Sequence, residues 1–237
     1  MSSISIFFPC YNDGATIANL IVEADRTARE LTDDYEIIVI DDDSIDCSRE
    51  ILSELTSKYK HLKLIFHSQN LGYGAVLRTG FTHATKELVF YTDGDGQYDV
   101  KELKELYLAM NEEIDIVNGY KISRSDPLHR IIVGNIYLFL MKIFFGFKIK
   151  DVDCDFRMIR RSILEDLNLI HNSGVICLEL VKKLENKGCR FIEIPVRHYF
   201  RAYGKSQFFN FRRLFRTGIE ILILWRELNF NKKVSLK

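Results

Sequence analysis

The sequence predicts an α/β fold, a mostly parallel sheet with helices covering both of its faces. Short apolar runs alternate with segments whose apolar residues recur at helical spacing, and this alternation continues from residue 4 to about residue 117. The run at residues 36–41 shows no alternation of polar and apolar side chains, as expected for a strand that is buried on both faces. With 237 residues, 47% of them hydrophobic and 28% charged, the chain has the length and composition of one globular domain of this class.

The first half of the chain supplies the regular alternation. Apolar runs predict strands at residues 4–8, 36–41, 62–66, 87–92 and 114–117. Apolar residues spaced three and four apart predict helices at residues 17–31, 51–59 and 73–84. A further helix is expected from Asp99, where Asp99 and Glu102 have the spacing of a capping box.

After residue 120 the pattern is looser. Residues 131–147 and 175–187 predict two helices, the second of which is stopped by Gly188, and residues 191–196 predict a returning strand. The last predicted helix, at residues 208–228, is amphipathic and mixes aromatic residues with arginines. Such a helix suits either packing on the domain or contact with a membrane surface.

Charge is balanced overall but unevenly distributed. Lys+Arg 33 and Asp+Glu 33 give a net charge of zero, yet residues 30–50 hold nine acids and one base, and residues 197–237 hold ten bases and two acids. A basic second half indicates an anionic partner, which is a phosphate, a lipid headgroup or a nucleic acid. The five cysteines are odd in number and include no C-x-x-C pair, so we expect reduced thiols in a cytosolic protein.

Neither a signal peptide nor a membrane-spanning helix is expected from the hydrophobic segments. The N-terminus lacks a basic region ahead of its apolar run, which has only the length of a strand. The longest apolar stretch, residues 131–147, is interrupted by Asn135 and Lys142. It is short for a spanning helix and fits an interfacial or buried helix better.

Two aspartates follow the predicted strand at residues 87–92, at the end where ligands bind in open α/β sheets. Asp93 and Asp95 converge only if the backbone turns, and the glycines at positions 94 and 96 allow such a turn. These carboxylates, with the amide oxygen of Gln97, are hard ligands that suit Mg²⁺ or Mn²⁺ bound to phosphates. The alternative is an acidic turn that caps the helix from Asp99.

Two other turns, after the second predicted strand and before the third predicted helix, carry residues that could contact a ligand. Asp41 and Asp42 end the second strand, where one carboxylate could accept an N–H of a nucleobase. The alternative is that this acidic turn caps the next helix through Asp46 or Ser48. Residues 70–74 precede the third helix and could bring the backbone close to a phosphate.

Two loops of the second half could face a substrate. Residues 151–157 place three acids beside an arginine, as in a substrate-facing loop or a salt-bridged turn. Residues 201–206 suit a basic loop that closes on phosphates, or a solvated loop. The histidines show no metal-ligand spacing and are interpreted as structural or surface residues.

The order of these motifs resembles that of the family 2 glycosyltransferases, which have the Rossmann-like GT-A fold. The motifs are P-C-Y-N-D at 9–13, D-D-D-S-x-D at 41–46, N-L-G-Y-G at 70–74, D-G-D-x-Q at 93–97, D-x-D-C-D-F-R at 151–157, E-I-P-V at 193–196 and R-x-x-G-K-S at 201–206. The chain is most similar to the polyprenyl-phosphate hexosyltransferases that resemble dolichol-phosphate mannose synthase. The resemblance covers about residues 4–206.

This resemblance implies a role for individual residues. Those that would hold the nucleotide-sugar are Pro9, Tyr11, Asn12, Asp13, Asp41, Asp42, Gly72, Asp93, Lys205 and Ser206. Those that would hold Mg²⁺ or Mn²⁺ under the donor diphosphate are Asp93, Asp95 and Gln97. Lys121 and Arg130 match the positions that receive a lipid phosphate. The implied catalytic residues are Asp95, Arg130, Asp153 and Arg201.

Three positions depart from the family pattern. Asp43 stands where Gly or Asn is usual, which concerns the choice of donor more than activity. Asp155 replaces the usual Gly before Phe-Arg, on the acceptor side of that loop. Lys121 stands where the family often has Arg, which keeps the charge and loses bidentate geometry.

The implied reaction is the inverting transfer of a hexose from a UDP- or GDP-linked sugar to a polyprenyl phosphate, undecaprenyl or dolichyl. A phosphate monoester carries about −1.5 to −2 charge at neutral pH, so it is already a nucleophile and needs cations more than a base. A hydroxyl acceptor would need a general base, for which Asp151, Asp153 and Asp155 are the candidates.

Two alternatives stay open at this point. One is a family 2 enzyme that adds sugar to a saccharide hydroxyl in cell-surface polysaccharide synthesis, although the Q-x-x-R-W signature of processive members is absent. The other is a non-catalytic nucleotide- or membrane-binding module. A nucleic-acid partner is not expected, because the basic residues are interleaved with apolar helices.

We expect residues 1–206 to form the catalytic domain and residues 207–237 an amphipathic helix with a basic tail. This tail is either part of the same domain or an element of the membrane surface. The protein is expected on the cytoplasmic face of the membrane as a peripheral protein. It would bind there directly or through a separate membrane anchor protein.

Overall fold

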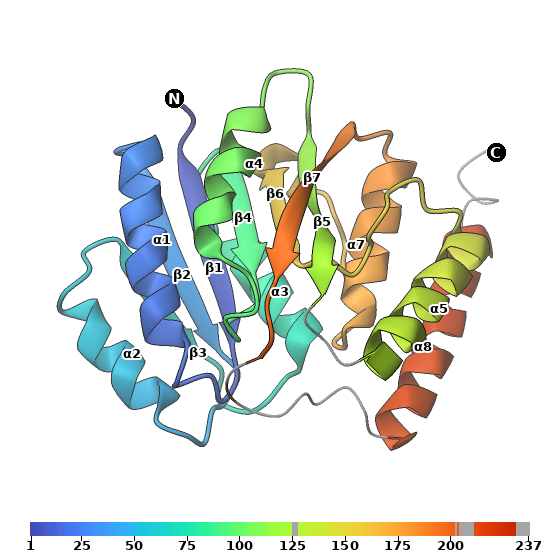
Figure 1. Cartoon of the computed structure of the whole chain (residues 1–237), viewed down its shortest axis with the longest axis horizontal. Helices are drawn as coiled ribbons and strands as arrows, with labels where there is room; N and C mark the ends of the chain where they lie inside the picture. The colour runs from blue at the N-terminus through green and yellow to red at the C-terminus, as the bar shows by residue number, and fades with distance from the viewer. Residues whose placement is uncertain (125–127, 202, 204–210, 231–237) are drawn as a thin grey trace.

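The structure, a computed structural model, describes residues 1–124, 128–201, 203 and 211–230 (Figure 1). Its centre is one sheet with the strand order β3-β2-β1-β4-β6-β5-β7. The strands are β1 Ile4–Cys10, β2 Tyr35–Asp41, β3 Leu62–Phe66, β4 Leu88–Thr92, β5 Ile116–Arg124, β6 Phe156–Arg160 and β7 Phe191–His198. Every strand predicted from the sequence is present, and β5 is longer than expected.

The sheet is mostly parallel, as predicted, and β6 is the exception. β1 pairs in parallel with β2 and β4, β2 with β3, and β5 with β7, whereas β6 is antiparallel to both β4 and β5. The sequence did not predict β6, because Arg157 interrupts its apolar pattern. Because β6 is antiparallel to both β4 and β5, those two strands run in the same direction. The carboxyl ends of all the strands other than β6 therefore lie at one edge of the sheet. Ligands of open α/β sheets bind at this edge.

Helices cover both faces of the sheet, as predicted (Figure 1). They are α1 Ile17–Leu31, α2 Ser48–Thr56, α3 Tyr73–His83, α4 Leu103–Ala109, α5 Leu128–Phe145, α6 Arg161–Leu164, α7 Val175–Asn186 and α8 Phe211–Phe230, with a 3-10 turn η1 at Val100–Glu102. One apolar cluster joins α1 and α4 to one face, and a second joins α3 and α7 to the other. A third cluster, which includes Met141, Val181 and Leu224, packs α5, α7 and α8 together beside the sheet.

The helix ends agree in part with the sequence. Asp99 accepts a hydrogen bond from the Lys101 N–H at 3.1 Å, but the Glu102 carboxylate accepts from the Arg197 N–H at 2.9 Å, so only half of the predicted capping box forms. Gly188 ends α7 as predicted, with φ +78°. The helix expected at residues 208–228 is α8, and residues 208–210 lie outside the described part. Among the described residues, no helix is both long and apolar enough to cross a bilayer.

Candidate active site

The turn after β4 requires both of its glycines. A Cβ on Gly94 would lie 2.3 Å from the carbonyl oxygen of Pro9, so only glycine allows this approach to the end of β1. Gly96 has φ +72°, in the left-handed region that glycine adopts without cost. The turn directs Asp93 toward α3, where its Oδ1 accepts from the Tyr73 hydroxyl at 2.8 Å. Asp95 Oδ1 accepts from the Gln97 N–H at 2.9 Å, which closes the turn.

Negative charge accumulates around this turn. Burial raises the pKa of Asp93 well above its usual range, and the nearby carboxylates of Asp155 and Asp95 raise it further. Burial also raises the pKa of Asp13 to about 6, against a hydrogen bond from the Tyr11 N–H, and Asp95 adds to this rise. Carboxylates that repel one another at a ligand-binding edge are typical of a site that is completed by a cation.

The residues present fit a divalent ion that is shared with a ligand. Within the described part of the chain, no group of three or more His, Cys, Asp or Glu side chains is arranged to hold a metal by itself. Mg²⁺ is usually held by one or two carboxylates together with substrate phosphates, not by a cage made only of protein. Asp93 and Asp95 supply the two carboxylates of such a site.

A short strap after β7 is joined to the same turn. The Tyr199 N–H donates to the Gln97 carbonyl at 2.8 Å, and Gln97 Nε2 donates to the Tyr199 carbonyl at 3.0 Å. Arg201 donates to Asp95 Oδ2, and its Nε approaches Gln97 Oε1 at 3.4 Å. The predicted metal ligands Asp95 and Gln97 are therefore both in contact with the predicted phosphate-binding residue Arg201.

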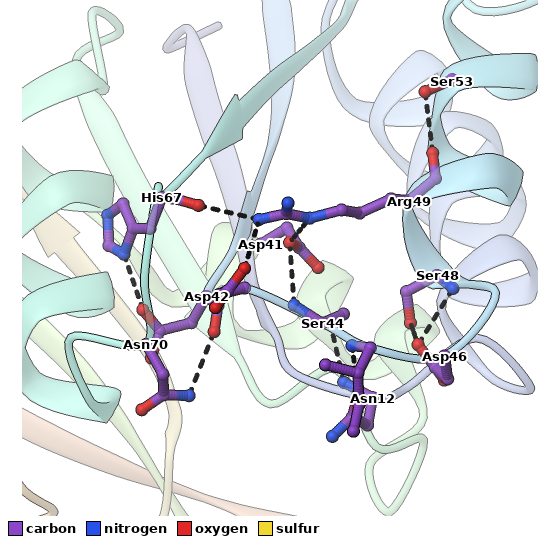
Figure 2. A network of polar contacts seen from close by, with 12 residues as sticks. Asn12, Asp41, Asp42, Ser44, Asp46, Ser48, Arg49, Ser53, His67 and Asn70 are labelled. Carbon is purple, nitrogen blue, oxygen red and sulfur yellow. Dashed lines mark hydrogen bonds and ion pairs between the residues drawn. The ribbon is translucent and has the colours of Figure 1, made fainter.

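The end of β2 carries the residues that were predicted to hold the nucleotide (Figure 2). Asn12, with φ +58°, accepts from the Ile45 N–H at 2.9 Å through its side chain and donates its own N–H to Ser44 Oγ at 2.9 Å. Asp41 is fully buried and accepts from Arg49 Nε at 2.5 Å and from the Ser44 N–H at 3.2 Å, both through Oδ1. Its Oδ2 is buried without a hydrogen-bond partner. This carboxylate keeps an acceptor for an incoming N–H or O–H.

Asp42 corrects the expectation for residues 70–74. Its carboxylate accepts from His67 Nδ1 at 2.7 Å, from the Leu71 N–H at 2.9 Å and from the Gly72 N–H at 2.8 Å. The backbone N–H groups at positions 71 and 72, expected to approach a phosphate, are therefore occupied by a protein carboxylate. Gly72 is required for a different reason, since it has φ +93° and its Cβ would lie 2.6 Å from the Asn172 carbonyl oxygen.

Arg49 was not predicted from the sequence, yet it organises this corner (Figure 2). Besides Asp41, it donates to the His67 carbonyl at 2.7 Å, approaches Asp43 at 3.5 Å and lies 5.4 Å from the ring centre of Phe66. Asp43 itself has φ +65°, the left-handed conformation for which the usual Gly or Asn is suited. No pattern in the sequence identifies Asp41 as the partner of Arg49. The position of an arginine in the first helical turn after an acidic loop did, however, indicate that it would pair with one of the loop's carboxylates.

The acidic turn contributes less to helix capping than its composition suggested. Asp46 Oδ1 accepts from the Ser48 N–H at 3.0 Å and from Ser48 Oγ at 2.5 Å, and Asp46 Oδ2 accepts from the Gly14 N–H at 3.1 Å. The residue at the N-cap of α2 is Cys47, whose side chain makes no capping hydrogen bond. Asp46 thus joins the β1 and β2 loops and bonds one N–H of the first helical turn.

Arg157 organises the turn of residues 151–157, which was predicted to face the acceptor. Its fully buried guanidinium donates to Asn118 Oδ1 at 2.5 Å, to the Tyr91 hydroxyl at 2.6 Å and to the Val152 carbonyl, and it lies 3.5 Å from Asp155. This favours the interpretation of residues 151–157 as a salt-bridged turn. The turn nevertheless lies at the site, because Asp155 is close enough to Asp93 to raise its pKa.

Lys121 and Asp153 meet at this turn. Lys121 Nζ donates to the Asp153 carbonyl at 2.8 Å and lies 3.5 Å from Asp151. Burial raises the pKa of Asp153 to about 7, against the opposing charge of Lys121. Burial and the nearby Asp153 also raise the pKa of Tyr137 on α5, which places that helix beside the turn.

The remaining predicted residues are only partly described. Pro9 is the last-but-one residue of β1, and Tyr11, which follows that strand, is 39% exposed at the edge. Arg130 belongs to the first turn of α5, but its side chain is not among those that the structure describes. Lys205 and Ser206 also lie outside the described residues. Their predicted roles therefore stay predictions.

The family model of glycosyl transferase family 2 matches residues 5–167, more than half of the chain. The chain belongs to glycosyl transferase family 2. The matched region includes the ends of β1 and β2, the turn of Asp93 and Asp95, and the turn of residues 151–157. The expectation of a family 2 glycosyltransferase is confirmed.

Two curated relatives resemble most of the chain. An undecaprenyl-phosphate 4-deoxy-4-formamido-L-arabinose transferase from Klebsiella pneumoniae is 27% identical over 215 residues, which are 90% of this chain and 64% of the relative. The protein of the same name from Salmonella choleraesuis is 28% identical over the same coverage. The chain therefore spans about 64% of the length of these relatives.

Solved structures share the fold at low sequence identity. Glucosyl-3-phosphoglycerate synthase from Mycobacterium tuberculosis, in complex with Mn²⁺, UDP and phosphoglyceric acid, matches 96% of this chain and 78% of its own, with TM-score 0.67 and 16% identity. Mannosyl-3-phosphoglycerate synthase from Rubrobacter xylanophilus matches the whole chain and 76% of its own, with TM-score 0.68 and 14% identity. A mannosyltransferase from Pyrobaculum calidifontis, in complex with GDP-Man and Mn²⁺, matches 86% and 58%, with TM-score 0.61 and 19% identity. The predicted GT-A fold is confirmed.

Proposed function

We propose that this protein transfers a hexose, with inversion and with help from a divalent metal, from a nucleotide-diphosphate sugar to a polyprenyl phosphate. The observation that carries this proposal is the turn of Asp93 and Asp95 at the carboxyl edge, flanked by Asp41 on one side and Lys121 on the other. The names of the two curated relatives, which are transferases acting on undecaprenyl phosphate, support the class of acceptor.

The donor would lie across β1, β2 and β4. Asn12, which follows β1, and Asp41, at the end of β2, would orient the base and ribose. Asp93 and Asp95 would hold Mg²⁺ or Mn²⁺, which when bound neutralises the charge that develops on the leaving diphosphate. Arg201 is placed to donate charge-assisted hydrogen bonds to the same phosphates. Metal complexes of the fold relatives from M. tuberculosis and P. calidifontis support the use of a divalent ion.

The acceptor would approach from the side of β5 and α5. Lys121 and Arg130 would place its phosphate, and the attack on the anomeric carbon comes from the face opposite the leaving diphosphate. Because a phosphate monoester is ionised at neutral pH, positioning supplies most of the acceleration and no strong base is required.

A second candidate function is transfer to a saccharide hydroxyl. The observation that favours it is Asp153, whose pKa is raised to about 7, the range in which a general base works best. A hydroxyl acceptor would need this carboxylate to accept its proton. A phosphate acceptor would use Asp153 only to hold Lys121 in place.

We also propose that α5 and α8 bring the protein to a membrane surface. The two helices lie side by side, and Trp225 Nε1 of α8 donates to the Phe144 carbonyl of α5 at 3.0 Å (Figure 1). Their exposed apolar side chains include Ile132, Val133, Ile136, Phe139, Ile143, Phe215, Ile219 and Leu222. α8 belongs to residues 207–237, the segment that was expected to be the amphipathic tail. Sedimentation with anionic and neutral vesicles tests this proposal. If the protein sediments with neither kind of vesicle, the proposal is contradicted.

The experiment that tests the transferase proposal uses labelled UDP-glucose, UDP-N-acetylglucosamine and GDP-mannose, each with a polyprenyl phosphate and Mg²⁺. The expected result is label in the organic extract for one donor, lost on addition of EDTA. Label that stays out of the organic phase but enters an added saccharide would support the second candidate function. The absence of both transfers and of donor hydrolysis would favour the non-catalytic binding module.

A further inference from the structure

The ladder between β5 and β7 is irregular at Ile122. Lys121 pairs with Val196 and Ser123 with Arg197, so Ile122 is an extra residue with no partner on β7. Its side chain is 57% exposed. A bulge of this kind redirects side chains and is common beside active sites. Here it separates an exposed isoleucine from a lysine whose side chain is 10% exposed.

A second exposed apolar residue belongs to the same edge. β7 runs parallel to β5 and continues into the strap, in which Tyr199 is fixed to Gln97 by two hydrogen bonds. Phe200 follows directly and is 64% exposed. Because β5 and β7 are parallel and adjacent, Ile122 and Phe200 both belong to the carboxyl edge of the sheet, and Ile122 directly follows Lys121 on β5.

Further exposed apolar residues belong to α5. That helix begins beyond the carboxyl ends of β5 and β7 (Figure 1). Its Tyr137 lies near Asp153, and its outer side exposes Ile132, Val133 and Ile136. Exposed apolar residues that occur singly are ordinary, but here several belong to the carboxyl edge and to the helix that begins beyond it, and one of them directly follows a lysine.

We propose that Ile122 and Phe200 bind the first isoprenoid units of the acceptor, directly behind its phosphate. This inference rests on the proposed polyprenyl-phosphate acceptor and names the residues that select its chain. The neighbouring Lys121 provides the positive charge that a phosphate needs. A hydrocarbon chain can contact the side chains of Ile122 and Phe200 without removing water from any polar group. A saccharide would gain no hydrogen bond from these two side chains.

The test uses a soluble acceptor, citronellyl phosphate, without vesicles, so that binding to a bilayer does not contribute. Ile122→Ser and Phe200→Ser should each lower kcat/KM for citronellyl phosphate about tenfold, the usual effect of lost apolar contact in a substrate site. The KM for the nucleotide-sugar and the rate of donor hydrolysis without acceptor should not change. Ile122→Leu should restore most of the loss.

The matched control is Ile143→Ser, which removes an isoleucine of the same apolar surface that is 64% exposed near the far end of α5. It should leave the vesicle-free rate unchanged. Wild-type kcat/KM in both Ile122→Ser and Phe200→Ser would overturn the subsite while leaving the proposed function standing. An equal loss in Ile143→Ser would also overturn it, because the effect would then be general. If the wild-type protein used no prenyl phosphate but did glycosylate a saccharide, the proposed function itself would fail.

Discussion

Glu179 offers the sharpest test of how the donor site is supported. This glutamate of α7 is fully buried, and its carboxylate accepts from the Ile170 N–H at 3.1 Å, the His171 N–H at 3.1 Å and His171 Nδ1 at 2.9 Å. Lys183 Nζ lies 2.5 Å from the same carboxylate. The segment held in this way bonds the start of α3, since the Gly74 N–H donates to the carbonyl of residue 172 at 2.8 Å.

The stabilisation by Glu179 can be calculated from its pKa. Although burial opposes ionisation, the hydrogen bonds from His171 and Lys183 lower the pKa of Glu179 from 4.5 to about 2. At about 1.4 kcal/mol per pH unit, the ionised form contributes about 3 kcal/mol at pH 7. A pKa lowered by folding gives stability that is complete above the unfolded value and is lost as the pH falls from about 4.5 toward about 2. The contribution should therefore be about half as large at pH 3.

Urea unfolding of the Glu179→Gln variant measures this contribution. The amide presents an NH₂ group to backbone donors, so the free energy of unfolding should fall by about 3 kcal/mol at pH 7, and the difference from wild type should shrink toward pH 3. The control is Glu165→Gln, whose partner is the exposed Arg161 one helical turn away, and which should change stability by less than about 0.5 kcal/mol. A difference for Glu179→Gln that is small, or that does not depend on pH, would refute the calculation.

Four further predictions concern the site and its support. Gly74→Ala should destabilise the fold by about 2 kcal/mol in urea unfolding, because its Cβ would lie 2.1 Å from the carbonyl oxygen of residue 171, while Gly174→Ala, with nothing within 4 Å, should not. Asp95→Ala should lower kcat by at least about 100-fold, since such an electrostatic group is worth on the order of 3 kcal/mol, and full turnover in excess EDTA would contradict this. With a hydroxyl acceptor, kcat should rise with pH through about 7, as Asp153 loses its proton, and Asp153→Asn should abolish this rise. Arg201→Ala should have opposite effects on metal binding and on turnover.

The centre of the sheet was predictable because β1, β2 and β4 are fully buried and mostly apolar, and a run of this kind reports burial directly. The partly exposed strands β3 and β7 were visible from their short apolar runs. β6 was not predictable, because it carries a charged side chain into the core. Arg157 is tolerated there only because Asn118, Tyr91 and the Val152 carbonyl accept from it, and these partners come from three separate segments. Such a network depends on tertiary placement, which local sequence patterns do not contain.

The candidate site divides in the same way. The turn of Asp93 and Asp95 was visible from its two carboxylates, its glycines and its place after a strand. The prediction that the backbone at residues 70–74 is open to a phosphate was wrong for positions 71 and 72, because Asp42 reaches across and accepts their N–H groups. Arg49 was missed for the same reason, since its bond to Asp41 joins a helix to the end of a neighbouring strand. Motifs thus identified the residues at the edge but not which of them bind one another.

Arg201 occupies one oxygen of Asp95 that a divalent ion at the proposed site would also need. Asp95 Oδ1 accepts from the Gln97 N–H, and Oδ2 accepts from Arg201, so metal binding through Oδ2 requires the guanidinium to move. The Arg201→Ala variant should therefore bind Mn²⁺ several-fold more tightly without donor, because the Arg201–Asp95 ion pair no longer has to be broken. With donor present, the same variant should have a lower kcat than wild type. In the wild-type protein, the guanidinium that the metal displaces is then free to bind the diphosphate, and the variant lacks this group. Mn²⁺ titration by calorimetry, beside an Arg197→Ala control whose 3.8 Å pair with Glu102 lies away from the turn, separates the two effects. Unchanged Mn²⁺ affinity in Arg201→Ala would show that Asp95 Oδ2 is not the oxygen that the metal needs.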